Sequence, residues 1–331
     1  MKFLISIIVL LFGAGILNAQ EDKDPILKLN GKYLGQSPPG SVPEVFAPDL
    51  ISTGLDELNS VFSPDGNEFY FSIRNPNFST IFVSKSVENH WGMPEPLPFT
   101  TKYKDIDVSV SPDGMKLFFS SNRKAEPNEE MTSGFDIWYC YKEGNNWGKP
   151  FKLGNEINSQ SDDFYPIVTR DGTIFFNSQR AGRGTNDIYI SRLKNGEYLP
   201  AEKLGDKINT AFREFDAYVD PDQNFIIFAS DRPGGFGQSD LYISFKTENN
   251  DWSQSTNMGP EINGTGYEFS PYLSPDGKYL FYTRQTWTPV TDPEVSLNRD
   301  YYFKALNSFD NLLGNIWWAD SKIIKELMPQ K

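Results

Sequence analysis

Ser63-Pro64-Asp65-Gly66 is the first of five related turn sequences spread through this 331-residue chain. The other four are Ser111-Pro112-Asp113-Gly114, Thr169-Arg170-Asp171-Gly172, Asp220-Pro221-Asp222-Gln223 and Ser274-Pro275-Asp276-Gly277. The turns are spaced almost evenly, and each one separates two runs rich in β-branched and aromatic residues. A repeat of this length, with several strands in each unit, predicts an all-β fold of the propeller type rather than a single sheet.

The third repeat shows the expected content of one unit. Residues 163–169 and 173–178 read as two strands around the Asp171-Gly172 turn, and residues 187–191 read as a third strand. Asn195-Gly196 is a strong hairpin signal, after which residues 198–204 read as a fourth strand. Four antiparallel strands joined in this way form one propeller blade.

The fifth repeat lacks a fourth strand after its third strand at residues 315–318. Residues 43–51 stand before the first repeat, in the place where a fourth strand belongs. We therefore expect the N-terminal strand to complete the last blade, which removes exposed sheet edges. This count predicts five blades; the alternative is six, with part of residues 22–55 or 285–314 forming the extra one.

The domain boundaries follow from these patterns. Residues 1–19 read as a signal peptide, since Lys2 precedes an apolar run from Phe3 to Leu17 and Ala19 suits cleavage. Residues 20–42 form an N-terminal extension, 43–320 the propeller and 321–331 a C-terminal tail. No cysteine follows the apolar run and no later stretch reaches transmembrane length, so the chain is expected to be periplasmic or secreted.

Composition excludes several function classes. The formal net charge of −13 argues against a nucleic-acid partner, which needs clustered lysine and arginine. Cys140 and His90 are the only residues of their kinds, which excludes an internal disulfide, thiolate metal clusters and mechanisms that depend on several histidines. We expect Cys140 to be buried and inert and His90 to lie in an exposed loop.

Three segments carry a family resemblance. Ser120-Ser-Asn-Arg123, Ser178-Gln-Arg180 and Ser230-Asp-Arg232 end the second strands, and Asp-Ile-Tyr follows later in the third repeat at 187–189. With the Pro-Asp-Gly turns, this pattern resembles the WD40-like, or PD40, repeats of the TolB type over about residues 43–320. The resemblance implies a propeller and a family that contains protein-binding members of envelope complexes. The chain has no room for the separate N-terminal domain found with such repeats in TolB-type proteins, so that role does not carry over.

An acidic residue recurs six positions before the end of each first strand. The five are Glu57, Asp105, Asp163, Glu214 and Glu268. An arginine recurs near the end of each second strand, at Arg74, Arg123, Arg180, Arg232 and Arg284. Period-two alternation predicts an acidic ring near one channel mouth with the arginines beside it, because five unneutralised carboxylates repel one another. The ring can be structural ion pairs, or it can bind a basic partner or a cation such as Ca²⁺, the one cofactor considered.

Positions two residues nearer the turn break the pattern, and they include Asp107 and Asp216. A catalytic pair should break the repeat symmetry, so these two are the candidate catalytic residues. Trp287, in the irregular stretch of the fifth repeat, is a candidate platform for a glycan or peptide.

The sequence leads to two functional hypotheses. The first is an exported module that binds a protein, peptide or glycan in the cell envelope and has no enzymatic activity. The alternative is a carbohydrate-active enzyme that uses channel-mouth carboxylates for glycoside hydrolysis.

Overall fold

Each repeated turn closes a hairpin by hydrogen bonding to its own backbone. The Ser63 hydroxyl donates to Asp65 Oδ1 at 2.6 Å, and the Asn67 amide donates to the same oxygen at 3.0 Å. Gly66 adopts a φ of 73°, which a residue without a side chain accepts at no steric cost. The same bonds recur around Asp113, Asp171 and Asp276. These four turn aspartates are therefore part of the scaffold.

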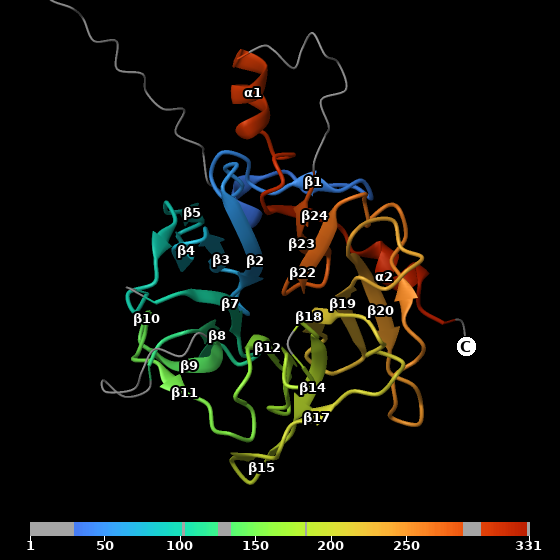
Figure 1. The fold of residues 1–331 in the computed structure, drawn as a ribbon. Helices are drawn as coiled ribbons and strands as arrows, with labels where there is room; N and C mark the ends of the chain where they lie inside the picture. Colours follow the sequence, from blue (N-terminus) through green and yellow to red (C-terminus); the bar gives the residue numbers. More distant parts are fainter. Residues whose placement is uncertain (1–29, 101–102, 125–133, 183, 287–298, 330–331) are drawn as a thin grey trace, which may run out of the picture.

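The computed structural model describes residues 30–100, 103–124, 134–182, 184–286 and 299–329. It forms a propeller of five antiparallel blades around one axis, and Figure 1 looks along that axis. The first strand of every blade contacts the first strands of both neighbouring blades, so the ring is closed. The prediction of five blades is confirmed.

The blades follow one another along the chain. Blade 1 contains β2 (Asp56–Phe62), β3 (Glu68–Arg74), β4 (Ser79–Val87), β5 (His90–Trp91) and β6 (Glu95–Pro96). Blade 2 contains β7 (Asp105–Val110), β8 (Lys116–Ser121), β9 (Asp136–Glu143), β10 (Asn146–Trp147) and β11 (Phe151–Lys152). Blade 3 contains β12 (Asp163–Val168), β13 (Ile174–Ser178), β14 (Asp187–Ser191) and β17 (Glu202–Lys203), with the hairpin β15 (Leu193–Lys194) and β16 (Glu197–Tyr198). Blade 4 contains β18 (Glu214–Val219), β19 (Phe225–Ser230), β20 (Asp240–Phe245) and β21 (Thr256–Asn257). Blade 5 contains β22 (Tyr267–Leu273), β23 (Tyr279–Gln285), β24 (Asn315–Asp320) and β1 (Glu44–Val45).

Blade 5 is completed by the N-terminal segment, as the sequence predicted. β1 pairs with β24 in antiparallel register, with Glu44 opposite Trp318. The Phe46 amide donates to the Ile316 carbonyl at 2.8 Å, and the Ser52 hydroxyl bonds both the amide and the carbonyl of Ile316. The N-terminal segment is thus joined to the last strand of the propeller by backbone hydrogen bonds at the outer edge of blade 5.

The connections between later blades use a related bond pattern. Asn209 Oδ1 accepts a hydrogen bond from the Ile188 amide at 2.8 Å, and its Nδ2 donates to the Ile188 carbonyl at 2.9 Å. Asn158 and Asn263 bond the third strands of blades 2 and 4 in the same way. These asparagines end a phrase that occurs as Leu-Gly-x-x-Ile-Asn at 153–158 and 204–209 and as Met-Gly-x-x-Ile-Asn at 258–263, and the phrase is a polar clamp that fixes each of these connections to the blade before it.

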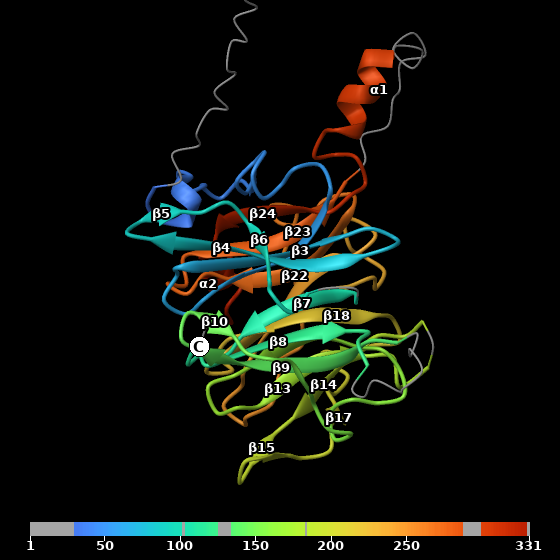
Figure 2. The same cartoon turned by 90° about the vertical axis from the view of Figure 1, so that its left-hand side faces the viewer.

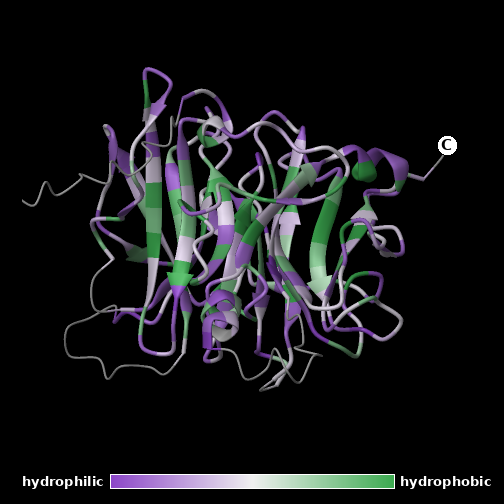
Figure 3. Cartoon of the chain, turned by 90° about the horizontal axis from the view of Figure 1, so that it is seen from above, coloured by the Kyte–Doolittle hydropathy of each residue, from purple (hydrophilic) through white to green (hydrophobic). Residues whose placement is uncertain are grey.

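Apolar side chains are concentrated on the strands and polar ones in the connections (Figure 3). The largest aromatic group lies where the chain ends meet, between blades 5 and 1. There the Phe46 ring packs within 5.1 Å of the rings of Phe69, Phe281 and Trp318, measured between centroids. Burial of these rings stabilises the closure.

Two expectations about the outer elements need correction. The segment predicted as the fourth strand of the third repeat, residues 198–204, is divided: Tyr198 ends the short hairpin of β15 and β16, and the outer strand β17 starts at Glu202. Trp91 and Trp147 end the corresponding hairpins of blades 1 and 2. Their rings turn back into the seams between blades, where Trp147 Nε1 donates to the Tyr70 hydroxyl of blade 1 at 2.9 Å.

The stretch between Arg284 and Gly314, expected to be irregular, contains helix α1 (Arg299–Leu306), which projects from the body (Figure 2). A short 3₁₀ helix, η1 (Tyr33–Gly35), precedes β1, and α2 (Lys322–Glu326) follows β24. The predicted signal peptide at 1–19 and Trp287 lie outside the described residues. None of the helices in the described ranges is long and apolar enough to cross a membrane.

The closure makes a direct prediction about stability. Phe46 is fully buried (0% exposed), so Phe46→Ala should lower the free energy of unfolding by about 3–5 kcal/mol through lost burial and a cavity. Val42→Ala, four residues earlier and 74% exposed, is the matched control and should change it by less than about 0.5 kcal/mol. Urea unfolding measures both. Equal effects would mean that the N-terminal segment does not support the propeller.

Candidate functional site

The first strand of every blade contains a β-bulge at its third or fourth residue. The pairing register with the second strand shifts at this point in all five blades. The five residues at the bulge all adopt a positive φ of 50–58°, although none is glycine: Asn59, Asp107, Tyr165, Asp216 and Ser270. Such backbone is unfavourable for these residue types and is retained where the surrounding fold or function requires it.

The bulges determine what faces the central channel. In a regular strand two consecutive side chains point to opposite faces, but here Ile106 and Asp107 line the same pocket, as do Phe215 and Asp216. The residue before the bulge is apolar in every blade, and the five form an apolar collar: Leu58, Ile106, Phe164, Phe215 and Phe269. The collar surrounds a cavity of about 270 Å³, which we call the channel-mouth pocket.

Polar groups occupy the floor and the rim of this pocket. Asp107, Asp216 and the buried Asn177 lie at the floor, and the other polar lining residues are Arg74, Asn186, Arg213, Tyr267 and Gln285. Tyr165 lies beside the two aspartates and crosses the channel from blade 3, where its hydroxyl donates to the Pro271 carbonyl of blade 5 at 3.1 Å. The pocket is therefore closed below and open at one end.

The two floor carboxyls interact with each other. Burial raises the pKa of Asp107 well above its ordinary value, and the negative charge of Asp216 raises it further. Burial also raises the pKa of Asp216 to about 6, against a hydrogen bond from Ser270 Oγ at 2.8 Å. The positive charge of Arg74 lowers both pKa values. Near neutral pH this arrangement favours one protonated and one ionised carboxyl side by side.

The recurring acidic residues lie elsewhere than the alternation predicted. Their side chains are 0% exposed and none of them lines a described pocket: Glu57, Asp105, Asp163, Glu214 and Glu268. In each first strand the acidic residue comes directly before the collar residue, and the bulge comes after both. Alternation therefore still holds between these two residues, and the acidic side chain lies on the face opposite the collar. The structure therefore removes these five from the residues that can contact a ligand in the channel.

Four of the predicted arginines neutralise these acids. The ion pairs are Arg123–Asp105 at 2.7 Å, Arg180–Asp163 at 2.9 Å, Arg232–Glu214 at 3.1 Å and Arg284–Glu268 at 2.9 Å. Three of the guanidinium groups also donate to the isoleucine carbonyl of the preceding connection, at Ile157, Ile208 and Ile262. Each such pair joins a connection to the blade that follows it.

Arg74 does not belong to this ring, which corrects the expectation from sequence. In the register of blade 1, Arg74 is paired with Asp56, and its Nε donates to Asp56 Oδ2 at 2.6 Å. Glu57 consequently has no arginine; it accepts a hydrogen bond from the Thr53 hydroxyl, and burial raises its pKa to about 7. Blade 1 is thus the one blade in which the arginine lines the channel mouth rather than the seam.

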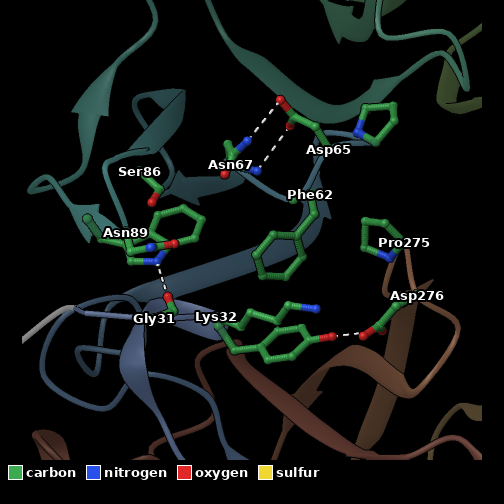
Figure 4. A pocket seen from close by; sticks show the side chains of 13 residues that line it. Gly31, Lys32, Phe62, Asp65, Asn67, Ser86, Asn89, Pro275 and Asp276 are labelled. Atoms are coloured by element: carbon green, nitrogen blue, oxygen red, sulfur yellow. Dashed lines mark hydrogen bonds between the residues drawn. The ribbon is translucent and has the colours of Figure 1, made fainter.

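A second pocket, of about 280 Å³, lies at the turn end between blades 1 and 5 (Figure 4). Its polar groups bond one another: the Tyr33 hydroxyl donates to Asp276 at 2.7 Å, Trp91 Nε1 donates to the Gly31 carbonyl, and Asn67 donates to Asp65. Residues of the N-terminal segment form part of this pocket, and its polar groups are already hydrogen bonded to one another. We therefore place the candidate site at the channel mouth.

A metal site was one of the possibilities raised by the acidic ring. Within the described ranges no cluster of three or more histidine, cysteine or acidic residues has the geometry to hold a metal ion. Cys140 is buried, which raises the pKa of its thiol to about 12, and His90 is exposed.

Sequence reasoning selected Asp107 and Asp216 but missed most of the pocket. It did not identify the collar as ligand-facing, nor Arg213, Asn177 and Asn186. The collar was visible as the apolar position between two polar ones in every first strand, but only the bulge turns it toward the channel. Arg213 lies just before β18 and has no repeated counterpart.

Comparisons with known proteins find the propeller in other chains but no close relative. No family model and no curated protein sequence matches. Among solved structures, TolB from Acinetobacter baumannii is similar over 81% of this chain, with 14% identity and a TM-score of 0.48, and this chain covers 57% of its length. An α-L-arabinofuranosidase from Lactobacillus brevis is similar over 82% of this chain and 91% of its own, with 11% identity and a TM-score of 0.49. A putative TolB from Agrobacterium tumefaciens is similar over 72% and 73%, with 18% identity and a TM-score of 0.47. No activity is transferred at these values.

Replacing Glu57 and Glu214 by glutamine should change the free energy of unfolding in opposite directions. Glu214→Gln should lower the free energy of unfolding by about 3 kcal/mol, because it leaves the largely buried Arg232 without its carboxylate. Glu57→Gln should raise it at pH 8, because it removes a buried charge that no arginine neutralises.

The Glu57 effect has a defined pH dependence. Since the folded-state pKa of about 7 lies above the ordinary value of 4.5, this group's contribution to stability is complete below 4.5 and is lost as pH rises through 7. The gain in melting temperature from Glu57→Gln should therefore be larger at pH 8 than at pH 5. A loss of stability in Glu57→Gln at pH 8 comparable to that of Glu214→Gln would contradict this account.

Proposed function

We propose that this protein is an exported β-propeller that binds one sugar unit of a glycan in the channel-mouth pocket. The observation that carries the proposal is the pair of carboxyl groups, Asp107 and Asp216, at the floor of a small pocket with an apolar collar. The apolar segment from Phe3 to Leu17 supports export to the periplasm or beyond.

The size and lining of the pocket support a saccharide over a protein surface. A cavity of about 270 Å³ suits one ring-sized group, and the floor carboxyls are recessed below the collar. Sugars present apolar faces and hydroxyl edges, and the collar offers Phe164, Phe215 and Phe269 to those faces.

The polar groups have the hydrogen-bonding character that hydroxyls need. A protonated carboxyl donates a hydrogen bond and its ionised neighbour accepts one, so the pair can bond two hydroxyl groups at once. Asn186 Oδ1, also at the pocket, is buried and accepts no hydrogen bond from the part of the chain that the structure describes. A ligand hydroxyl would satisfy it.

Titration calorimetry against a panel of mono- and oligosaccharides tests the proposal. We expect Asp107→Asn and Asp216→Asn each to weaken binding of the best ligand by about tenfold or more, because the first removes the O–H donor of the protonated carboxyl and the second removes the ionised acceptor. Asp206→Asn, at an exposed aspartate outside the described pockets, is the control and should bind as the wild type does. Unchanged affinity in both floor variants would overturn the assignment of the site.

Glycoside hydrolysis is the second candidate, and the unequal environments of the two carboxyls favour it. Asp107 is 5% exposed while Asp216 is half-buried, so burial favours the protonated form more at Asp107. Protonated Asp107 would give its proton to the glycosidic oxygen as the C–O bond breaks. Ionised Asp216 would take a proton from the water that attacks the anomeric carbon.

If this candidate is correct, kcat/KM should rise with pH through about 6 as Asp216 ionises, and fall at higher pH as Asp107 loses its proton. Asp107→Asn should reduce kcat by about 100-fold or more on unactivated glycosides. Reducing-end release from polysaccharides measures both. Binding without turnover by the wild type would leave the protein as a binding module.

A further inference from the structure

Blade 1 places the cation of Arg74 at the channel mouth, and the buried Glu57 of the same blade therefore lacks the arginine that the other blades supply. In blades 2, 3 and 4 the arginine lies two residues after the end of the second strand and reaches the buried acid. Arg74 instead ends β3, lines the pocket and leaves Glu57 without a cationic partner. This exchange weakens the fold locally, so the position of Arg74 calls for a role at the pocket.

A second arginine lines the same pocket from blade 4. The Arg213 amide and Nε donate to the two carboxylate oxygens of Asp231, at 2.8 Å and 2.6 Å. Its guanidinium carbon lies 5.8 Å from the centre of the Phe215 ring of the collar. Blades 1 and 4 are separated by blade 5, so the two arginines approach the pocket from different sides.

Both guanidinium groups are anchored in a way that leaves donors free. Arg74 and Arg213 each use Nε for the ion pair, and neither has a recorded bond through its Nη atoms to any residue that the structure describes. Their side chains are 38% and 44% exposed. A guanidinium fixed at Nε presents its two Nη groups as a pre-oriented pair of donors, which matches the two oxygens of a carboxylate.

The pocket is therefore bipolar, with a carboxyl pair at the floor and two guanidinium groups at the rim. A neutral sugar uses only the floor and the collar. A sugar with one carboxylate satisfies both ends, because its hydroxyls bond the floor and its carboxylate lies at the rim.

We propose that the channel-mouth pocket selects a saccharide that carries a carboxylate, of the hexuronic acid class, and that Arg74 and Arg213 hold this carboxylate. The proposal rests on the proposed function of the pocket as a sugar site. It adds a class of ligand and two residues that determine specificity.

The experiment compares matched sugars that differ only in the carboxylate. Calorimetry is run with oligomers of galacturonic acid against galactose and of glucuronic acid against glucose. The wild type should bind the acidic member of at least one pair ten times more tightly or better. This preference should fall when salt rises from 0.05 to 0.5 M, while affinity for the neutral member should not.

Arg74→Gln and Arg213→Gln should each reduce the ratio of acidic-sugar to neutral-sugar affinity about tenfold, whatever the affinity of the variant for the neutral sugar. Arg170→Gln is the matched control, since Arg170 also pairs with an aspartate through Nε but lies at the turn end of the channel. The ratio between two ligands on one variant is insensitive to partial unfolding, so a structural role alone does not change it.

The outcomes separate the two proposals. Equal affinity of the wild type for acidic and neutral sugars, or a preference that both arginine variants retain, overturns the ligand class and leaves the sugar site standing. Failure of every saccharide to bind overturns the proposed function and the ligand class together.

Discussion

The buried polar clamp between neighbouring blades is the interaction on which the rest of the structure depends. An asparagine fixes the connection to the blade before it, and an arginine paired with a buried acid fixes the same connection to the blade after it. Buried charges are tolerated only when they are paired and hydrogen bonded, so these contacts allow one arrangement of adjacent blades. The clamps hold the three connections from blade 2 to blade 5, and the bonds of Phe46 and Ser52 to Ile316 complete blade 5, so that the five bulges meet at one channel mouth.

Much of this fold could be predicted from the sequence because its signals are local. The Pro-Asp-Gly turns and the Leu-Gly-x-x-Ile-Asn phrase recur in register, and residues 43–51 occupy the place of the missing strand. The face of the first strands on which the acidic side chains lie relative to the channel could not be predicted, because a bulge decides which side chains face the channel. Tyr165 and Ser270 give no sign in their residue types of the positive φ that they adopt, whereas asparagine and aspartate, as at Asn59, Asp107 and Asp216, enter this region more readily.

Some residues of the candidate site could be predicted from the sequence and others could not. Asp107 and Asp216 stood out because they are acidic at a position where the other repeats are not. Arg74 could not be separated from the ring arginines, since a shift of one residue in strand register decides whether the side chain enters the seam or the channel. Arg213 lies outside any repeated pattern, and its place at the pocket follows only from the packing of blade 4 beside blade 5. The residues of the candidate site are thus those that differ from the pattern repeated in the other blades.

The closure of blade 5 by β1 also has a consequence for the kinetics of folding. Phe46 bonds Ile316 across most of the length of the chain, so the ring cannot close until synthesis has passed β24. Until then the early blades must persist as an open array with an unpaired first edge, and contacts between residues so distant in sequence form slowly. The N-terminal segment therefore makes the last blade depend on the first strand, since β1 has no partner until β24 has formed.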